Sequence, residues 1–347
     1  MSLLVPKALL TVLFSLCAAS LAGAVEPPYD PALLHPFNPP GLWRGEGIGL
    51  IGGRMINSSM DILNVKTDSS SVGDYSSFRG GLRYGVRDSF EFFGDIERAD
   101  LDISRTFGSV GITTVTSGGR WVGRSYQNDL VGSWDFGYRT HLGDEFTSDR
   151  LTINNTDITA TVTAPPGGHL ISGNTSDWEL YTRGILGKSL FKDTFTMYGL
   201  LGFHYVKDRS SFNFQNLNFA LSASDRALFG RVQQNLGRTE QHYEAGLGAN
   251  WHPLDRLALN VSYKYYYIQR QWPVAAFSGQ LNRNQQIDGN VDIRLTKAIH
   301  LLFEATYFQY GLLTEIPSLY NERTQSRFAQ NYGYLGLSLR MFFFTGL

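Results

Sequence analysis

Three residues in the second half of the chain are the main candidates for catalysis or metal binding. His204, His242 and Glu244 fall on the same face of two predicted strands, near the same end of each. A His-His-carboxylate set could hold a metal ion or act as a general base. The connection between the two strands is 32 residues long, so the sequence leaves their register open. Solvated histidines are the plainer interpretation, and we expect no enzyme, no cofactor and no metal site.

A larger set consists of charged residues of both signs at alternate positions. If these residues line a water-filled interior, their charges would create a transverse electric field that orders water and screens solutes. Paired with one another, they would instead neutralise and fill a narrow interior. The polar face of the predicted strands carries twelve acidic and nine basic residues in all. This excess of acids predicts that a pore would weakly prefer cations. The candidate pore-lining residues are Arg79, Arg83, Glu91, Asp95, Glu97, Asp129, Asp135, Arg139, Glu179, Arg183, Lys264, Asp292, Arg294 and Arg340.

The elements that position these charges are strands. From Leu257 to Tyr267 every odd position is apolar or aromatic, and the even positions are Ala, Asn, Ser, Lys and Tyr. A strand separates two such sets onto opposite faces, whereas a helix would mix them. Twelve segments follow this pattern, at about 44–56, 74–86, 89–101, 125–140, 145–162, 175–187, 194–207, 240–252, 256–269, 285–296, 299–312 and 329–343.

The connections between these segments alternate between short and long. The short turns are 87–88, 141–144, 188–193, 253–255 and 297–298, and the long loops are 57–73, 102–124, 163–174, 208–239, 270–284 and 313–328. This alternation is typical of a transmembrane barrel whose two ends lie on the short-turn side. A soluble sandwich also alternates apolar and polar residues, but its loops need not alternate and its strands are seldom ten residues long throughout.

Composition excludes several other classes. With 42% hydrophobic and 14% aromatic residues, the chain is not intrinsically disordered. Its 30 basic and 31 acidic residues lack the basic excess of a nucleic-acid-binding protein. The mean hydropathy of −0.18 is too low for a bundle of membrane helices, and only one apolar run approaches the length of a membrane span.

That run lies at the N-terminus and is typical of a cleavable signal peptide at residues 1–24. Lys7 precedes an apolar stretch, and Ala22-Gly23-Ala24 forms a small-residue cleavage site. The alternative, an uncleaved anchor, lacks a basic flank after the run. The only cysteine, Cys17, lies in this segment, so the mature chain would have no disulfide. Residues 25–43 contain six of the twelve prolines and predict an extended periplasmic segment.

The two faces of each strand predict which side chains meet lipid. A barrel satisfies its backbone between strands, so the uniformly apolar face is the one that contacts the bilayer. If the turn at 87–89 is tight, Arg79 lies opposite Glu97, and Arg83 lies diagonal to Glu91 and Asp95. In the longest loop, 219–234 has helical spacing, and we predict a short helix that folds over or into the mouth. Packing without any gating role is the alternative.

With these features, the chain resembles the porin-like outer-membrane β-barrel proteins of Gram-negative bacteria. The features that carry the resemblance are the signal peptide, the alternation from Arg44 to Phe343, and the last strand. Gly336, Leu339 and Met341 in that strand match the spacing of the family's barrel-assembly signal. The resemblance implies an all-β, antiparallel, up-and-down barrel at 44–347, with short periplasmic turns and long extracellular loops. Its partners would be outer-membrane lipids and the barrel-assembly machinery, and a homo-oligomer is left open.

The expected function is a passive, weakly selective pore for small hydrophilic solutes in the outer membrane. A non-conducting structural or surface-binding barrel is the first alternative. An outer-membrane lipid-modifying enzyme is the second. Barrel phospholipases of this size use a lipid-facing Ser/His arrangement, and the predicted lipid face of this chain carries no histidine.

Overall fold

The structure is a computed structural model that describes most of the chain after residue 41. The described residues are 42, 44–56, 75–104, 108–125, 129–148, 150–155, 158–163, 166, 168–191, 194–214, 223, 226–227, 230, 234, 236–321, 324–329 and 331–344. The predicted signal peptide, and all of the Pro-rich segment except Leu42, lie outside these residues and remain predictions.

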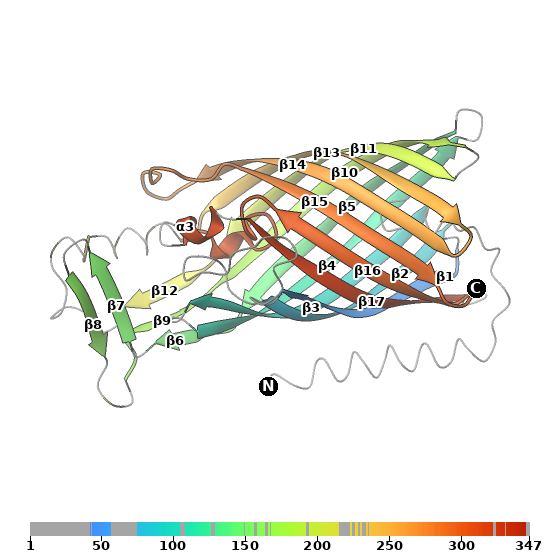
Figure 1. The fold of residues 1–347 in the computed structure, drawn as a ribbon. Coiled ribbons are helices and arrows are strands. Elements are labelled where there is room, and N and C mark those ends of the chain that lie inside the picture. The colour runs from blue at the N-terminus through green and yellow to red at the C-terminus, as the bar shows by residue number, and fades with distance from the viewer. Residues whose placement is uncertain are drawn as a thin grey trace.

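Twelve antiparallel strands close into a single barrel (Figure 1). β1 pairs with both β2 and β17, which seals the sheet and leaves no exposed edge. The first and last strands meet at the short-turn end, as predicted. The barrel strands are β1 (Glu46–Ile56), β2 (Tyr75–Arg87), β3 (Phe90–Ser104), β4 (Gly108–Ser125), β5 (Leu130–Gly143), β10 (Ser176–Leu190), β11 (Phe195–Asp208), β13 (Thr239–Leu254), β14 (Leu257–Gln271), β15 (Arg283–Arg294), β16 (Ile299–Phe308) and β17 (Tyr332–Phe344).

The predicted number of strands is confirmed, but one strand was assigned to the wrong segment. β4 occupies most of 102–124, which we expected to be a long loop, and 145–162 lies outside the barrel. The inward positions of β4 include Thr114, Thr116 and Gly118, so its alternation is too weak in hydrophobicity to recognise. As a result, β5 runs in the opposite direction to that predicted, and residues 141–144 lie at the long-loop end. The β3–β4 connection, 105–107, is short.

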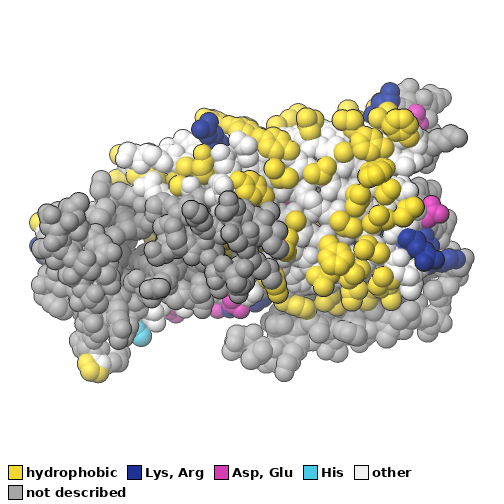
Figure 2. All heavy atoms as spheres, viewed as in Figure 1, with side chains coloured by type: hydrophobic (Ala, Val, Ile, Leu, Met, Phe, Trp, Pro, Cys, Tyr) yellow, Lys and Arg dark blue, Asp and Glu magenta, His cyan; other side chains and the backbone are white. Residues whose placement is uncertain are grey.

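The lipid-facing residues are placed as predicted. Leu201 and Leu247 are each 70% exposed on the outer wall, and Phe92, Leu180, Leu186 and Met197 are also exposed there. Figure 2 shows hydrophobic side chains spread over the barrel wall, with charged side chains gathered near the ends of the strands. This surface is the inverse of a soluble protein, because the solvent it faces is hydrocarbon.

Charge on this outer face should be costly in proportion to its depth. Leu201 is the central residue of β11, whereas Leu254 ends β13 beside a short turn and is 66% exposed. We expect Leu201→Arg to lower the free energy of unfolding by about 2–4 kcal/mol and Leu254→Arg to lower it by about 0–1 kcal/mol. Urea titration of the protein in lipid vesicles measures both. Equal losses would contradict the assignment of this face to lipid.

Smaller elements lie beyond the long-loop end of the barrel (Figure 1). β6 (Phe146–Ser148), β9 (Ile171–Asn174) and β12 (Ser211–Phe214) form a three-stranded sheet, and β7 (Arg150–Asn155) pairs with β8 (Ile158–Thr163). The β16–β17 connection contains a 3-10 helix, η3 (Pro317–Leu319), and a short helix, α3 (Gln325–Phe328). In the described part of the chain, no helix has the length and apolar character needed to cross a membrane.

Candidate functional site

The inward side chains of the barrel enclose a chamber of about 390 Å³. All twelve barrel strands contribute to its wall, and residues 312–316 of the β16–β17 connection contribute from the long-loop side. Eight basic and six acidic side chains line the chamber. The basic residues are Arg54, Arg79, Arg83, Arg120, Arg139, Arg183, Lys264 and Arg340, and the acidic residues are Asp95, Glu97, Asp135, Asp288, Glu304 and Glu315.

One row of alternating charge crosses four neighbouring strands. Cross-strand pairing places Glu91 beside Arg120, Arg120 beside Asp135, and Asp135 beside Arg183. Arg120 donates from Nε and Nη2 to the two oxygens of Asp135, at 2.7 and 2.8 Å. Arg83 donates to Glu91, which also lies 3.5 Å from Arg120. Bidentate arginine pairs of this kind hold both groups in one geometry.

The predicted His204, His242 and Glu244 cluster does come together. The two histidines lie directly opposite each other on β11 and β13, with ring centroids 6.2 Å apart. However, both ring nitrogens of His204 already contact carboxylates: Nδ1 lies 2.5 Å from Glu179 and Nε2 lies 3.1 Å from Glu244. Neither nitrogen of His204 is therefore free to take a proton from a substrate.

His242 contacts a different carboxylate, with its Nε2 2.8 Å from Glu240. Glu244 accepts from Arg183 at 2.8 Å and from the Tyr266 hydroxyl at 3.1 Å. Among the described residues, no three His, Cys, Asp or Glu side chains are arranged to hold a metal ion. The cluster is part of an ion-pair network.

Ion pairs also connect strands on the other side of the chamber. Arg79 lies opposite Glu97, as the tight turn requires, but its guanidinium donates to Glu304 on β16. Glu97 instead accepts from Arg54 at 3.1 Å. Lys264 pairs with Asp288 at 2.9 Å. The charges therefore neutralise one another in part, without filling the whole interior.

Two of the fourteen candidate pore-lining residues lie away from the chamber. Asp129 is exposed in the β4–β5 turn, where its φ of 51° places it outside the strand ladder. Arg294 is the last residue of β15, at the short-turn end. The other twelve line the chamber or lie directly behind its lining. Asp95 is exposed to the chamber. Sequence reasoning missed Arg120, because it lies in the missed strand β4.

His141 was also misplaced by the reversed direction of β5. It was expected at a short turn, but it lies inside the long-loop end, buried, with its Nδ1 2.6 Å from Asp177. Asp177 in turn accepts the backbone N–H of Ser318 at 3.0 Å. This contact joins β10 to η3, which enters the barrel from strands on the opposite side.

The β16–β17 connection lies in the mouth of the barrel. We call residues 309–331 the mouth segment; of these, 309–321, 324–329 and 331 are described. Its buried residues Leu312, Leu313, Ile316, Leu319, Tyr320 and Phe328 form one apolar cluster. The cluster continues into inward residues of the barrel, among them Leu101 on β3 and Ile112 on β4. Burying this much apolar surface holds the mouth segment inside the barrel.

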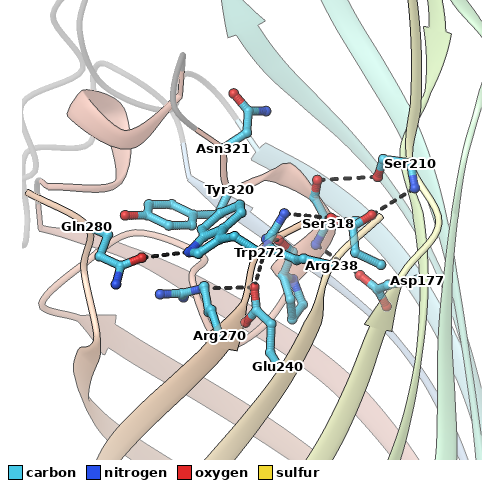
Figure 3. Close-up of polar contacts among 12 residues, drawn as sticks. Asp177, Ser210, Arg238, Glu240, Arg270, Trp272, Gln280, Ser318, Tyr320 and Asn321 are labelled. Atoms are coloured by element: carbon cyan, nitrogen blue, oxygen red, sulfur yellow. Dashed lines mark hydrogen bonds and ion pairs between the residues drawn. The ribbon is translucent and has the colours of Figure 1, made fainter. Parts of the chain in front are cut away.

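A fully buried arginine fixes the far side of the mouth segment (Figure 3). Arg238 donates to Asp208 at 2.6 Å, to Glu240 at 2.5 Å and to the carbonyl of Pro317 at 2.6 Å. Burial alone would lower the pKa of Arg238, but the Glu240 and Asp208 carboxylates outweigh it and raise the pKa above its usual value. The side chain therefore stays charged in an environment without water.

A second arginine supports the same corner. Arg270 donates to Glu240 at 2.9 Å, and its guanidinium lies 4.5 Å from the centre of the Tyr320 ring. The Tyr320 hydroxyl accepts the backbone N–H of Leu281 at 2.7 Å. Burial raises the pKa of this hydroxyl. The mouth segment is thus connected by side chains, rather than by strand pairing, to β10, to Arg238 before β13, to β14 and to the β14–β15 loop.

The predicted helix in the longest loop is only partly within the described residues. Ala223, Arg226, Ala227, Gly230 and Gln234 are helical, and all of them except the half-buried Gly230 are exposed. The other residues of 219–234 lie outside the described part of the chain, so the placement of this helix at the mouth stays a prediction.

The fold is similar to those of outer-membrane proteins. The translocator domain of the autotransporter NalP from Neisseria meningitidis aligns with a TM-score of 0.50 and 10% identity, over 97% of this chain and 96% of that one. The COG4313 outer membrane channel from Pseudomonas putida F1 aligns with a TM-score of 0.46 and 11% identity, over 87% and 97%. For the NanC porin the values are 0.42, 10%, 85% and 98%.

No family model and no curated protein sequence matches the chain. At identities near 10% these likenesses concern the fold alone. The closed twelve-stranded barrel and its apolar outer wall define an outer-membrane β-barrel of porin-like architecture. The protein lies in the bacterial outer membrane. Its short turns face the periplasm and its long loops face outward.

Proposed function

We propose that this barrel is an outer-membrane pore for passive diffusion of small hydrophilic solutes. The observation that carries the proposal is the chamber of about 390 Å³ inside the wall, lined by fourteen charged side chains. A barrel of eight strands is filled by its own side chains, whereas twelve strands leave interior space. Partly exposed charges around such a space favour water and polar solutes over an apolar filling.

The mouth segment narrows this path on the outer side. Its apolar cluster and the Arg238 contacts place it across the lumen, so the conductance of the resting pore should be small. The apolar packing of this segment inside the mouth is the observation that favours the second candidate, a non-conducting barrel whose loops bind a partner. We propose no catalytic role, because His204 is held between two carboxylates.

Single-channel recording of the mature protein in planar bilayers tests the pore directly. We expect stepwise conductance, because charged and polar side chains from all twelve barrel strands line the chamber. A barrel that inserts, shows the heat-dependent gel mobility of a folded barrel, and stays silent would refute the pore and favour the non-conducting candidate.

Two neighbouring residues on opposite faces provide a matched pair of variants. Thr116 lines the chamber, whereas Val115, next to it on β4, faces lipid. Thr116→Trp should lower the conductance by about twofold or more, since an indole ring fills part of the path. Val115→Trp adds the same ring outside and should leave the conductance unchanged. A similar effect of both changes would mean that ions do not pass through this chamber.

The remaining expectations from the sequence also stand as proposals. Export would remove residues 1–24, and the last strand with Gly336, Leu339 and Met341 would be read by the barrel-assembly machinery. An oligomer of such barrels would bury part of the outer wall.

A further inference from the structure

The chamber presents its positive charges to water and keeps many of their partners out of it. Four arginines form what we call the guanidinium wall: Arg83, Arg120, Arg139 and Arg183. Their side chains are 12–24% exposed. Their partner carboxylates on Glu91, Asp135, Glu179 and Glu244 are only 0–4% exposed. The ion pairs are balanced in number but not in position.

Side-chain length and hydrogen bonding explain this asymmetry. An arginine is long enough to pass over its partner, so its head ends nearer the lumen than the shorter carboxylate does. The carboxylates are also occupied from behind. Glu91 accepts the backbone N–H of Leu42 at 3.1 Å, and Glu244 accepts from Tyr266 and His204. A guanidinium has five N–H donors, more than one such partner can accept.

The ion pairs on the other side of the chamber lack this asymmetry: Glu304 is 18% exposed beside Arg79 at 12%, and Asp288 is 11% exposed beside Lys264 at 7%. Asp95 is exposed within the same region, but the basic residues Arg79 and Arg83 are among its nearest charges. Glu315 contributes one acidic side chain from the mouth segment. Over the whole lining, eight basic side chains face six acidic ones. Counting residues on one face of the strands gave the opposite sign, because that count includes carboxylates buried behind the arginines.

We propose that the chamber is a binding site for small anions, specifically organic carboxylates, and that the pore prefers anions to cations. The inference rests on the proposed pore and names its class of solute. A carboxylate can take two parallel N–H donors from an arginine, which gives both affinity and orientation. The Tyr181 ring lies 5.8 Å from the Arg139 guanidinium, so the wall also offers an aromatic surface to the remainder of the solute.

The reversal potential in a KCl gradient tests the sign. The wild-type protein should show a chloride-to-potassium permeability ratio above one. A double substitution that removes one ion pair conserves the net charge. It therefore tests whether selectivity depends on where the charges lie rather than on how many there are. R139Q/E179Q deletes a guanidinium that is 24% exposed and a carboxylate that is 2% exposed. We expect this variant to lower the ratio by about twofold.

The control removes an ion pair outside the chamber. Arg98 and Asp144 are 39% and 56% exposed at the outer end, so R98Q/D144N should leave the ratio unchanged. R183Q/E244Q removes a second ion pair, between the wall residue Arg183 on β10 and Glu244 on β13, and should act like R139Q/E179Q. Agreement between the two variants guards against misfolding of one of them. In the wild-type pore, gluconate should reduce chloride current and glucose should not.

The outcomes separate the two proposals. No conductance from a folded barrel overturns the pore itself. A conducting barrel that prefers potassium overturns the anion site and leaves the pore standing. An anion-selective pore whose ratio is unchanged in both chamber variants places the selectivity outside the guanidinium wall and overturns this assignment.

Discussion

Replacing Arg238 with methionine is expected to lower the free energy of unfolding by about 3–5 kcal/mol, the largest loss for any single side chain discussed above. The arginine and both carboxylates that it contacts, Asp208 and Glu240, have fully buried side chains. Removing the cation leaves Asp208 with the backbone N–H of Ser210 but without its ion-pair partner, whereas Glu240 keeps Arg270 and His242. The carbonyl of Pro317 also loses its donor. Unpaired charge without water is far more costly than a missing surface pair.

Graded replacements should separate charge from geometry. Arg238→Lys keeps the charge, but a single ammonium cannot reach two carboxylates and a carbonyl in one plane, so an intermediate loss is expected. Combining R238M with D208N should recover part of the loss, because both members of that ion pair are removed while Glu240 keeps Arg270 and His242. Arg98→Met removes an exposed pair and should cost about 0–1 kcal/mol.

Urea titration followed by tryptophan fluorescence measures all four variants, and Trp272, 4.8 Å from Arg238, reports on this corner. A loss for Arg238→Met no larger than that for Arg98→Met would show that the mouth network does not stabilise the barrel.

The barrel could be predicted from sequence because lipid imposes a strict rule on every strand. A lipid-facing residue such as Leu201 must be apolar, whereas the next residue along the strand points into the barrel and can be polar. The alternation is hard to recognise where the inward residues are small, as at Thr114 and Thr116. For this reason the prediction missed β4. The strand count survived because a β-branched segment in the β5–β10 connection was counted in place of β4.

The chamber contacts could be predicted only across tight turns. Arg79 and Glu97 are joined by a short hairpin, so their register follows from the chain. The contact between Arg79 and Glu304 spans 225 residues and depends on closure of the barrel. The difference in exposure between the four arginines of the guanidinium wall and their carboxylates likewise depends on closure of the barrel. Counting residue types along the sequence cannot reveal it.

The sequence of the mouth segment does contain a sign that it packs inside the barrel. Leu313 and Ile316 are apolar residues in the connection expected at 313–328, directly after Leu312 at the end of the predicted strand, and loops exposed to water rarely contain such a group. The sequence could not say what they pack against, since their partners lie on β3, β4 and β14. The helical pattern at 219–234 was the more visible feature, but most of those residues lie outside the described part of the chain, and their placement at the mouth stays a prediction.

Removing the mouth segment is expected to raise single-channel conductance by about threefold or more, since the lumen of a twelve-stranded barrel is wider than the resting path. Phe308 and Tyr332 are already paired between β16 and β17, so residues 309–331 can be replaced by a two-residue Asn-Gly hairpin turn. The strands and their lipid-facing side chains stay intact, whereas the apolar cluster of Leu312, Leu313, Ile316 and Tyr320 is lost.

A deletion in the longest loop is the matched control. Residues 215–234 precede Arg238 and leave its contacts with Asp208 and Pro317 in place. If the mouth segment limits the current, this deletion should leave conductance unchanged, and only the 309–331 replacement should raise it. The reverse result would assign the constriction to the longest loop. Equal conductance in all three proteins would place the narrowest point deeper in the barrel, where Arg83, Arg120 and Asp135 line the chamber. The Thr116→Trp variant would then change the conductance more than either deletion does.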